Sequence, residues 1–245
     1  ASNRAFATMR RRLSSAGSVS LRLANSRQDY EDETLFDTRT DTASLSGDYG
    51  FSANTSLTMS YTYTDYRYEL AGGDSSTVTH GVQAGVSNQL SPGTSVSISG
   101  GVVYVVYEGN LDEAPTWTAS ANFVKAFQTT TFTMDYLRSV TNTVGLANEI
   151  SITDRVSMNL NRTLGRSFSA NANGSLLRYR SVPSGNVDTT SYTVAIGLSW
   201  RPYSWLALDA NYSHFRQWVE NFSGLNITRD QVFININATP NELRF

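Results

Sequence analysis

The 245-residue sequence contains no cysteine and only two histidines. Without cysteine, disulfide frameworks, thiolate metal sites and cysteine nucleophiles are excluded. His80 and His214 each stand among apolar residues at alternate positions, and neither has nearby in the sequence the clustered ligands or the nucleophile that a metal or hydrolytic site requires. We therefore expect no metal, no cofactor and no enzymatic activity.

Charge and long apolar runs are also scarce. Charged residues make up 16% of the chain, and 19 basic against 21 acidic residues leave a net charge of −2. This balance gives no reason to expect a nucleic-acid partner. The longest apolar run, GVVYVVY at 101–107, is far shorter than the roughly 18 residues of a membrane-spanning helix. A helical membrane protein is therefore excluded.

Polar turn segments recur along the chain at intervals of about 35 to 39 residues, as in SSAG at 14–17, SANT at 52–55 and SPGT at 91–94. A second set of polar breaks, such as AGGDS at 71–75, falls between them. Each interval is the length of one long β-hairpin. Counting from Ser18 to Thr239 predicts about twelve strands of roughly 13 to 16 residues, against a usual length of ~5 to 6.

Within the expected strands, apolar and polar residues alternate. In TSLTMSYTYT at 55–64, Leu57, Met59 and Tyr61 share one face, while the Ser and Thr residues share the other. The same two-residue period returns in most of the other expected strands, and no helical period competes with it. The sequence therefore predicts an all-β fold with one apolar and one polar face.

Such alternation fits either a soluble β-sandwich or a transmembrane β-barrel. Three features favour the barrel: the strand length, polar faces dominated by Ser, Thr and Asn, and aromatic residues near both ends of strands whose centres carry small residues. Lipid would then contact the apolar face. The aromatic residues that we expect at the membrane interfaces are Tyr66, Tyr68, Trp117, Trp200, Trp205 and Trp218.

The alternation, the hairpin period and the closing Phe245 resemble those of bacterial outer-membrane β-barrels. Two segments, RPYSWLALDANYSHFR at 201–216 and ITRDQVFININAT ending at Thr239, resemble the β-barrel porins associated with exopolysaccharide export. Pro240 departs from the pattern because it interrupts the alternation before Phe245. The resemblance implies the bacterial outer membrane as the location, the lipid bilayer and periplasmic export or envelope proteins as partners, and a role in polysaccharide export.

The predicted fold is one closed antiparallel transmembrane β-barrel of about twelve strands, or fourteen if residues are missing upstream. Residues 14–245 form this barrel. Residues 1–13 form a separate N-terminal segment, which is the end of a further strand, a flexible arm, or a plug that carries Arg10, Arg11 and Arg12.

We expect a porin-like channel that passes small hydrophilic solutes or a polysaccharide chain, with weak ion selectivity. The alternatives are a structural barrel that anchors partner proteins and a soluble β-sandwich carbohydrate-binding module. Lys125 and Arg138 fall on the apolar face, where they either snorkel to the interface or mark a subunit contact. The residues predicted to line the pore are Arg22, Asp48, Thr58, Ser60, Asp135, Arg155, Asn171, Asn173, Asp209, Asn211, Asn235 and Asn237.

Overall fold

The computed structural model describes residues 2–29, 37–69, 75–107, 110–142, 150–182, 188–220 and 226–239. These residues form thirteen β-strands. None of them belongs to a helix that could cross a membrane. The strands are β1 (Ser2–Arg12), β2 (Gly17–Gln28), β3 (Asp37–Gly50), β4 (Thr55–Glu69), β5 (Ser75–Ser91), β6 (Thr94–Tyr107), β7 (Asn110–Ala126), β8 (Thr130–Asn142), β9 (Ile150–Thr163), β10 (Phe168–Val182), β11 (Asp188–Tyr203), β12 (Leu206–Val219) and β13 (Ile227–Ala238).

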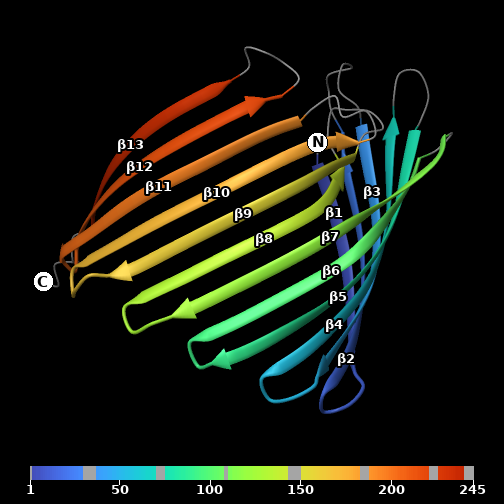
Figure 1. Ribbon diagram of the computed structural model, residues 1–245, viewed down its shortest axis with the longest axis horizontal. Coiled ribbons are helices and arrows are strands. Elements are labelled where there is room, and N and C mark those ends of the chain that lie inside the picture. Colours follow the sequence, from blue (N-terminus) through green and yellow to red (C-terminus); the bar gives the residue numbers. More distant parts are fainter. Residues whose placement is uncertain are drawn as a thin grey trace, which may run out of the picture.

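All thirteen strands belong to one antiparallel sheet in which each strand pairs with its neighbours in sequence, from β1 to β13 (Figure 1). The prediction of an all-β antiparallel fold is confirmed. The count of about twelve strands is one short, because residues 2–12 form β1. This strand pairs along its whole length with β2, from Ser2 opposite Gln28 to Arg12 opposite Ser18.

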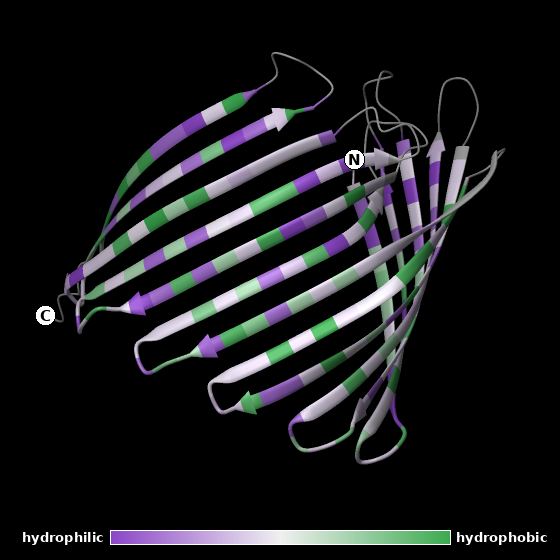
Figure 2. Cartoon of the chain, viewed as in Figure 1, coloured by the Kyte–Doolittle hydropathy of each residue, from purple (hydrophilic) through white to green (hydrophobic). Residues whose placement is uncertain are grey.

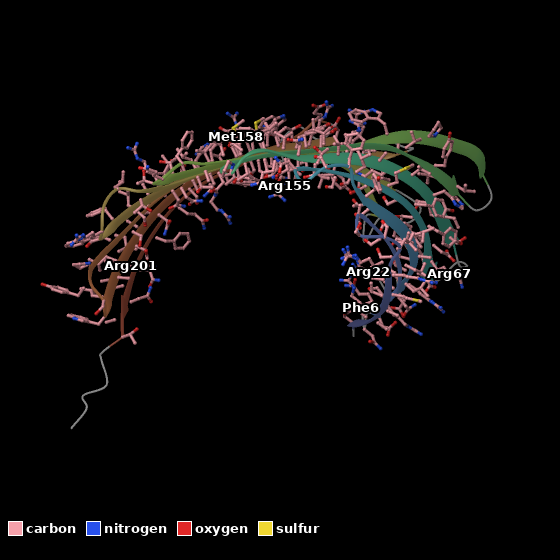
Figure 3. All side chains as sticks on the ribbon, turned by 90° about the horizontal axis from the view of Figure 1, so that it is seen from below. Phe6, Arg22, Arg67, Arg155, Met158 and Arg201 are labelled. Carbon is pink, nitrogen blue, oxygen red and sulfur yellow. The ribbon has the colours of Figure 1, made fainter. Side chains whose placement is uncertain are left out.

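The sheet is a curved, open arch when viewed from below (Figure 3). Its two edges are β1 and β13, which do not pair with each other in the described part of the chain. The predicted closure is therefore not observed and stays a prediction. Because backbone N–H and C=O groups cannot remain unpaired in hydrocarbon, both edges require a further pairing partner in a bilayer.

The register between strands keeps every residue row on one face of the sheet. One convex row runs across five strands and is apolar, comprising Leu45, Tyr61, Val82, Val102 and Trp117. The adjacent row faces the concave side and comprises Ser46, Ser60, Gln83, Gly101 and Thr118. Hydropathy alternates along the strands accordingly (Figure 2), and Met158 lies on the convex face whereas Arg155 lies on the concave face (Figure 3).

In the described part of the chain, no second layer lies over the apolar face. Among the described residues, the buried hydrophobic side chains are only Tyr68 and Val105, whereas Met59, Ile196 and Ile234 are 64%, 54% and 75% exposed. A soluble sandwich would bury this face against a second sheet. The alternative of a soluble β-sandwich is therefore wrong, and the uncovered apolar face is one that a lipid bilayer would cover.

Tight turns join the strands at one rim of the sheet. In the turn between β1 and β2, the hydroxyl of Ser14 accepts a hydrogen bond from the backbone N–H of Gly17 at 2.9 Å. Ser52 accepts one from the N–H of Thr55 at 3.1 Å in the turn between β3 and β4. Serine favours turns because its side chain replaces a missing backbone acceptor.

Close packing between β5 and β6 requires glycine at position 101. A Cβ atom there would lie 2.2 Å from the carbonyl oxygen of Val82 and 2.9 Å from the Cα atom of Gln83. At the neighbouring Gly100, the nearest atom to such a Cβ is the carbonyl oxygen of Thr118, at 3.9 Å. Position 101 therefore has no room for a side chain, whereas the neighbouring position 100 of the same strand does.

We expect Gly101→Ala to lower the free energy of unfolding by about 1–3 kcal/mol, because the new methyl group forces β5 and β6 apart. Gly100→Ala serves as the control and should change it by less than about 1 kcal/mol, since the site has room. Denaturant unfolding in detergent micelles, followed by tryptophan fluorescence, measures both. Equal stability of the two variants would contradict the close pairing of β5 and β6 at Gly101.

Candidate functional site

The concave face is the candidate site, and its wall consists largely of hydroxyl and amide groups. These groups hydrogen bond across neighbouring strands: Ser20 to Ser46 at 2.7 Å and Ser99 to Ser120 at 2.7 Å. The side-chain amide of Gln83 donates to the Ser99 hydroxyl at 2.6 Å. The pairs fix the side chains in place while leaving a neutral polar surface.

A shallow hollow of about 340 Å³ lies in this wall. Its polar lining comprises Thr58, Ser60, Gln83, Ser87, Ser97, Ser99 and Ser120, from strands β4 to β7. Hydroxyl and amide groups can replace the hydration of a polar solute without trapping it, which passage requires. The hollow can therefore contact hydroxylated solutes weakly.

The register places all twelve predicted pore-lining residues on the concave face. Their hydrogen bonds connect adjacent strands: Thr58 donates to Asp48 at 3.3 Å, and Asn122 donates to Asp135 at 2.6 Å. Whether they line a pore stays a prediction. These twelve predicted residues are Arg22, Asp48, Thr58, Ser60, Asp135, Arg155, Asn171, Asn173, Asp209, Asn211, Asn235 and Asn237.

Two of these asparagines meet over a glycine. Asn171 in β10 and Asn211 in β12 both lie opposite Gly197 in β11. A Cβ atom at position 197 would lie 2.2 Å from one amide oxygen and 2.4 Å from the other. The missing side chain thus lets the two amides approach each other across the middle strand.

The predicted interface aromatics divide into two groups. Trp117, Trp200 and Trp218 lie in convex rows, and Trp205 stacks on Tyr203 in the turn before β12 with 5.5 Å between ring centroids. Tyr66 and Tyr68 differ, because the even positions of β4 face the concave side. Tyr68 is 2% exposed, so its assignment to a lipid interface is wrong.

Most ion pairs of the described residues lie on the convex face, in the part of the strands away from the tight turns. Arg138 and Asp154 lie opposite each other in β8 and β9, with 2.9 Å between Nη1 and Oδ2, and their side chains are 17% and 28% exposed. The Arg138 guanidinium also lies 4.0 Å from the ring centroid of Trp117. Arg138, which the sequence predicted either to snorkel or to mark a subunit contact, is therefore neutralised by a residue of the adjacent strand. Lys125, the other cation that the sequence placed on the apolar face, donates to the Thr94 hydroxyl at 2.7 Å.

Both histidines have polar partners on neighbouring strands. His214 lies opposite Asp230, with 2.8 Å between Nδ1 and Oδ1, and its Nε2 lies 3.1 Å from the Tyr192 hydroxyl. His80 lies 2.9 Å from the hydroxyl of Tyr61. These partners come from other strands, so their separation in sequence concealed them. The described residues contain no group of three His, Asp or Glu side chains that could hold a metal ion.

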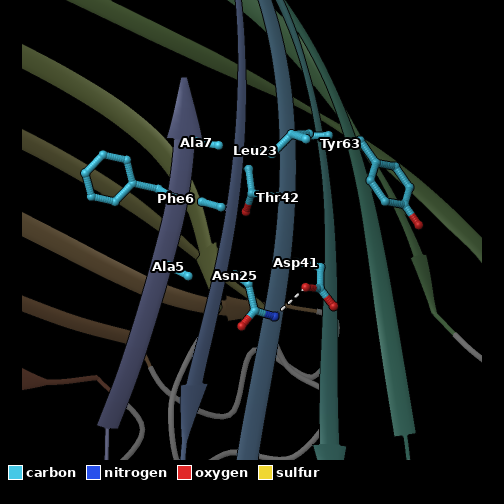
Figure 4. Close-up of a pocket in the computed structure, with 10 residues that line it drawn as sticks. Ala5, Phe6, Ala7, Leu23, Asn25, Asp41, Thr42 and Tyr63 are labelled. Atoms are coloured by element: carbon cyan, nitrogen blue, oxygen red, sulfur yellow. Dashed lines mark hydrogen bonds between the residues drawn. The ribbon is translucent and has the colours of Figure 1, made fainter. Parts of the chain in front are cut away.

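A second hollow, of about 470 Å³, lies on the convex face over β1 to β4. Its lining includes Ala5, Ala7, Leu23 and Tyr63, and at one end Asn25 donates to Asp41 at 2.6 Å (Figure 4). The small alanine side chains leave this space beside larger neighbours. Because it opens on the apolar side, it does not belong to the candidate lumen surface.

Comparison with solved structures identifies the fold. No family model and no curated protein sequence matches the chain. The FrpB iron transporter from Neisseria meningitidis (F5-1 variant) is similar with a TM-score of 0.60 and 11% identity, over 83% of this chain and 42% of that one. The copper transporter OprC matches with 0.59 and 10%, over 89% and 48%. The ferric yersiniabactin uptake receptor FyuA from Yersinia pestis matches with 0.53 and 9%, over 90% and 43%.

The chain therefore has the fold of bacterial outer-membrane β-barrel proteins, and it spans less than half the length of these three structures. The outer-membrane location expected from the sequence agrees with this fold and with the uncovered apolar face. The association with exopolysaccharide export has no counterpart in these comparisons.

We expect Asp154→Asn to lower the free energy of unfolding in detergent by about 2 kcal/mol, between the values for exposed and buried pairs, because Arg138 loses its partner. The double variant Asp154→Asn with Arg138→Met should recover most of this loss. A double-mutant cycle from denaturant unfolding measures both. Additive effects of the two substitutions would show that the pair does not stabilise the sheet.

Proposed function

We propose that this chain forms the wall of an outer-membrane channel and that small hydrophilic solutes pass along its concave face. The observation that carries the proposal is the division of the sheet into an uncovered apolar face and a face of hydroxyls and amides. In a bilayer, such a sheet can turn only its polar side toward a water-filled path.

The similar structures support transport as the general role, since two of them are named as iron and copper transporters and the third as an uptake receptor. Metal transport itself is not part of the proposal, because the described residues offer no cluster of metal ligands. The hydroxyl-lined hollow on the concave face favours neutral, hydroxylated solutes such as small sugars.

A barrel that only anchors partner proteins is the competing role. It would need no continuous polar wall, and its interior could be filled by side chains. The concave hydroxyl and amide groups extend from β2 to β13, which favours a solvated path over a filled interior.

The decisive experiment uses cysteine variants at two adjacent positions of β10. Asn173 faces the concave side and Ala172 the convex side, and the natural chain contains no cysteine. In proteoliposomes that take up a small neutral sugar, we expect a bulky thiol reagent applied from the water to reduce the flux of Asn173→Cys several-fold, because the attached group obstructs the path.

Ala172→Cys is the matched control and should keep its flux after the same treatment, because lipid covers that position. Liposomes with the unmodified chain that show no sugar flux above empty liposomes would contradict the channel and favour the anchoring role.

A further inference from the structure

Charged side chains are distributed differently on the two faces of the sheet. On the convex face, three arginines lie beside carboxylates: Arg138 by Asp154, Arg178 by Asp188 at 2.8 Å, and Arg67 by Asp65 at 2.7 Å. Each of these cations is therefore compensated locally. The net charge of the whole chain is close to zero, but it does not show how the charges on the concave face are balanced.

The concave face carries more cations than anions in the described strands. Its anions are Asp48, Asp135 and Asp209. The cations on concave rows are Arg4, Arg10, Arg12, Arg22, Arg155 and Arg229.

Four of these six arginines come from β1 and β2. Arg10 and Arg12 line a hollow of about 540 Å³ at the rim of tight turns, together with Ser18 and Asp48. Arg12 donates to the backbone carbonyl oxygens of Ser14 and Ser15, at 3.0 and 2.9 Å. These bonds hold its guanidinium at the turn.

The one carboxylate that lines this hollow neutralises only part of the positive charge of the two arginines. Asp48 lies 3.9 Å from Arg10, whose side chain is 68% exposed, and a pair so exposed is weak. Arg10 also donates to the Ser18 hydroxyl at 2.9 Å, which directs the guanidinium toward the concave side. Two arginines therefore share the rim with a single acid.

Deeper along the concave face, Arg22 and Arg155 extend the positive surface. Arg22 lies over the ring of Phe6, with 5.6 Å between its guanidinium carbon and the ring centroid. Arg155 lies on the concave side of the central part of the arch, so the two cations face the same space from different parts of the sheet (Figure 3). The excess charge is thus spread over the wall.

We propose that the concave face selects for small anions, with Arg10 and Arg12 attracting them at the rim of tight turns. This inference rests on the proposed channel. A wall of low dielectric constant concentrates the field of its charges in the water beside it, and arginines serve this purpose in anion-conducting pores. The hydroxyl groups between the arginines supply donors to a passing anion.

The test is the reversal potential of the reconstituted chain in planar bilayers under a gradient of potassium chloride. We expect chloride to permeate about threefold better than potassium or more, which corresponds to a difference of about one kT between the free energies of the two ions beside the wall. The preference should weaken at high salt, because screening shortens the reach of the arginines.

A matched pair of variants on one strand assigns the effect to the concave face. Arg10→Glu should lower the chloride preference, whereas Arg11→Glu makes the same charge change on the convex side and should leave it unchanged. Equal effects of the two substitutions would overturn the assignment to the concave face.

The possible failures are distinguishable. Open channels of the natural chain that prefer potassium, or that show no preference, would overturn the anion selectivity and leave the channel standing. An absence of conductance would overturn the channel and the selectivity together.

Discussion

The separation of the two faces depends on one constraint, the unbroken pairing of consecutive antiparallel strands. Successive side chains of a strand point to opposite faces, so a one-residue slip at any pairing would exchange the apolar and polar rows of every later strand. The three register shifts all lie near strand ends, at Gln89/Ser91, Val105/Tyr107 and Trp200/Tyr203. The apolar and polar rows therefore stay on opposite faces across the sheet. The same register determines on which face each charged residue lies.

The two-residue period of the sequence made the assignment of residues to the two faces predictable. Residues 55–64 show the alternation clearly, and the register assigns Thr58 and Ser60 to the polar side as expected. The first strand was harder to recognise, because Phe6 falls on the polar side and Arg11 on the apolar side, which blurs the pattern of residues 2–12. Alternation shows on which face a residue lies once the strand is known. Where the alternation is blurred, it does not show that a segment forms a strand.

Contacts between strands could not be predicted from local pattern. His214 and Asp230 belong to different strands, and so do Arg138 and Asp154, and only the register brings each pair together. Tyr66 and Tyr68 were assigned to the lipid interface by residue type, although their even positions in β4 place them on the concave face. Closure is a further property of this kind, since it depends on what pairs with β1 and β13 and not on the pattern within either strand.

The most direct test of the central claim, that the concave face meets water and the convex face meets lipid, is a spin-label scan of residues 56–63 in lipid bilayers. Collision rates with oxygen report contact with lipid, and those with a water-soluble nickel complex report contact with water. We expect alternation, with nickel contact at Ser56, Thr58, Ser60 and Thr62 and oxygen contact at Leu57, Met59, Tyr61 and Tyr63. The opposite phase, or nickel contact at all eight positions, would contradict it.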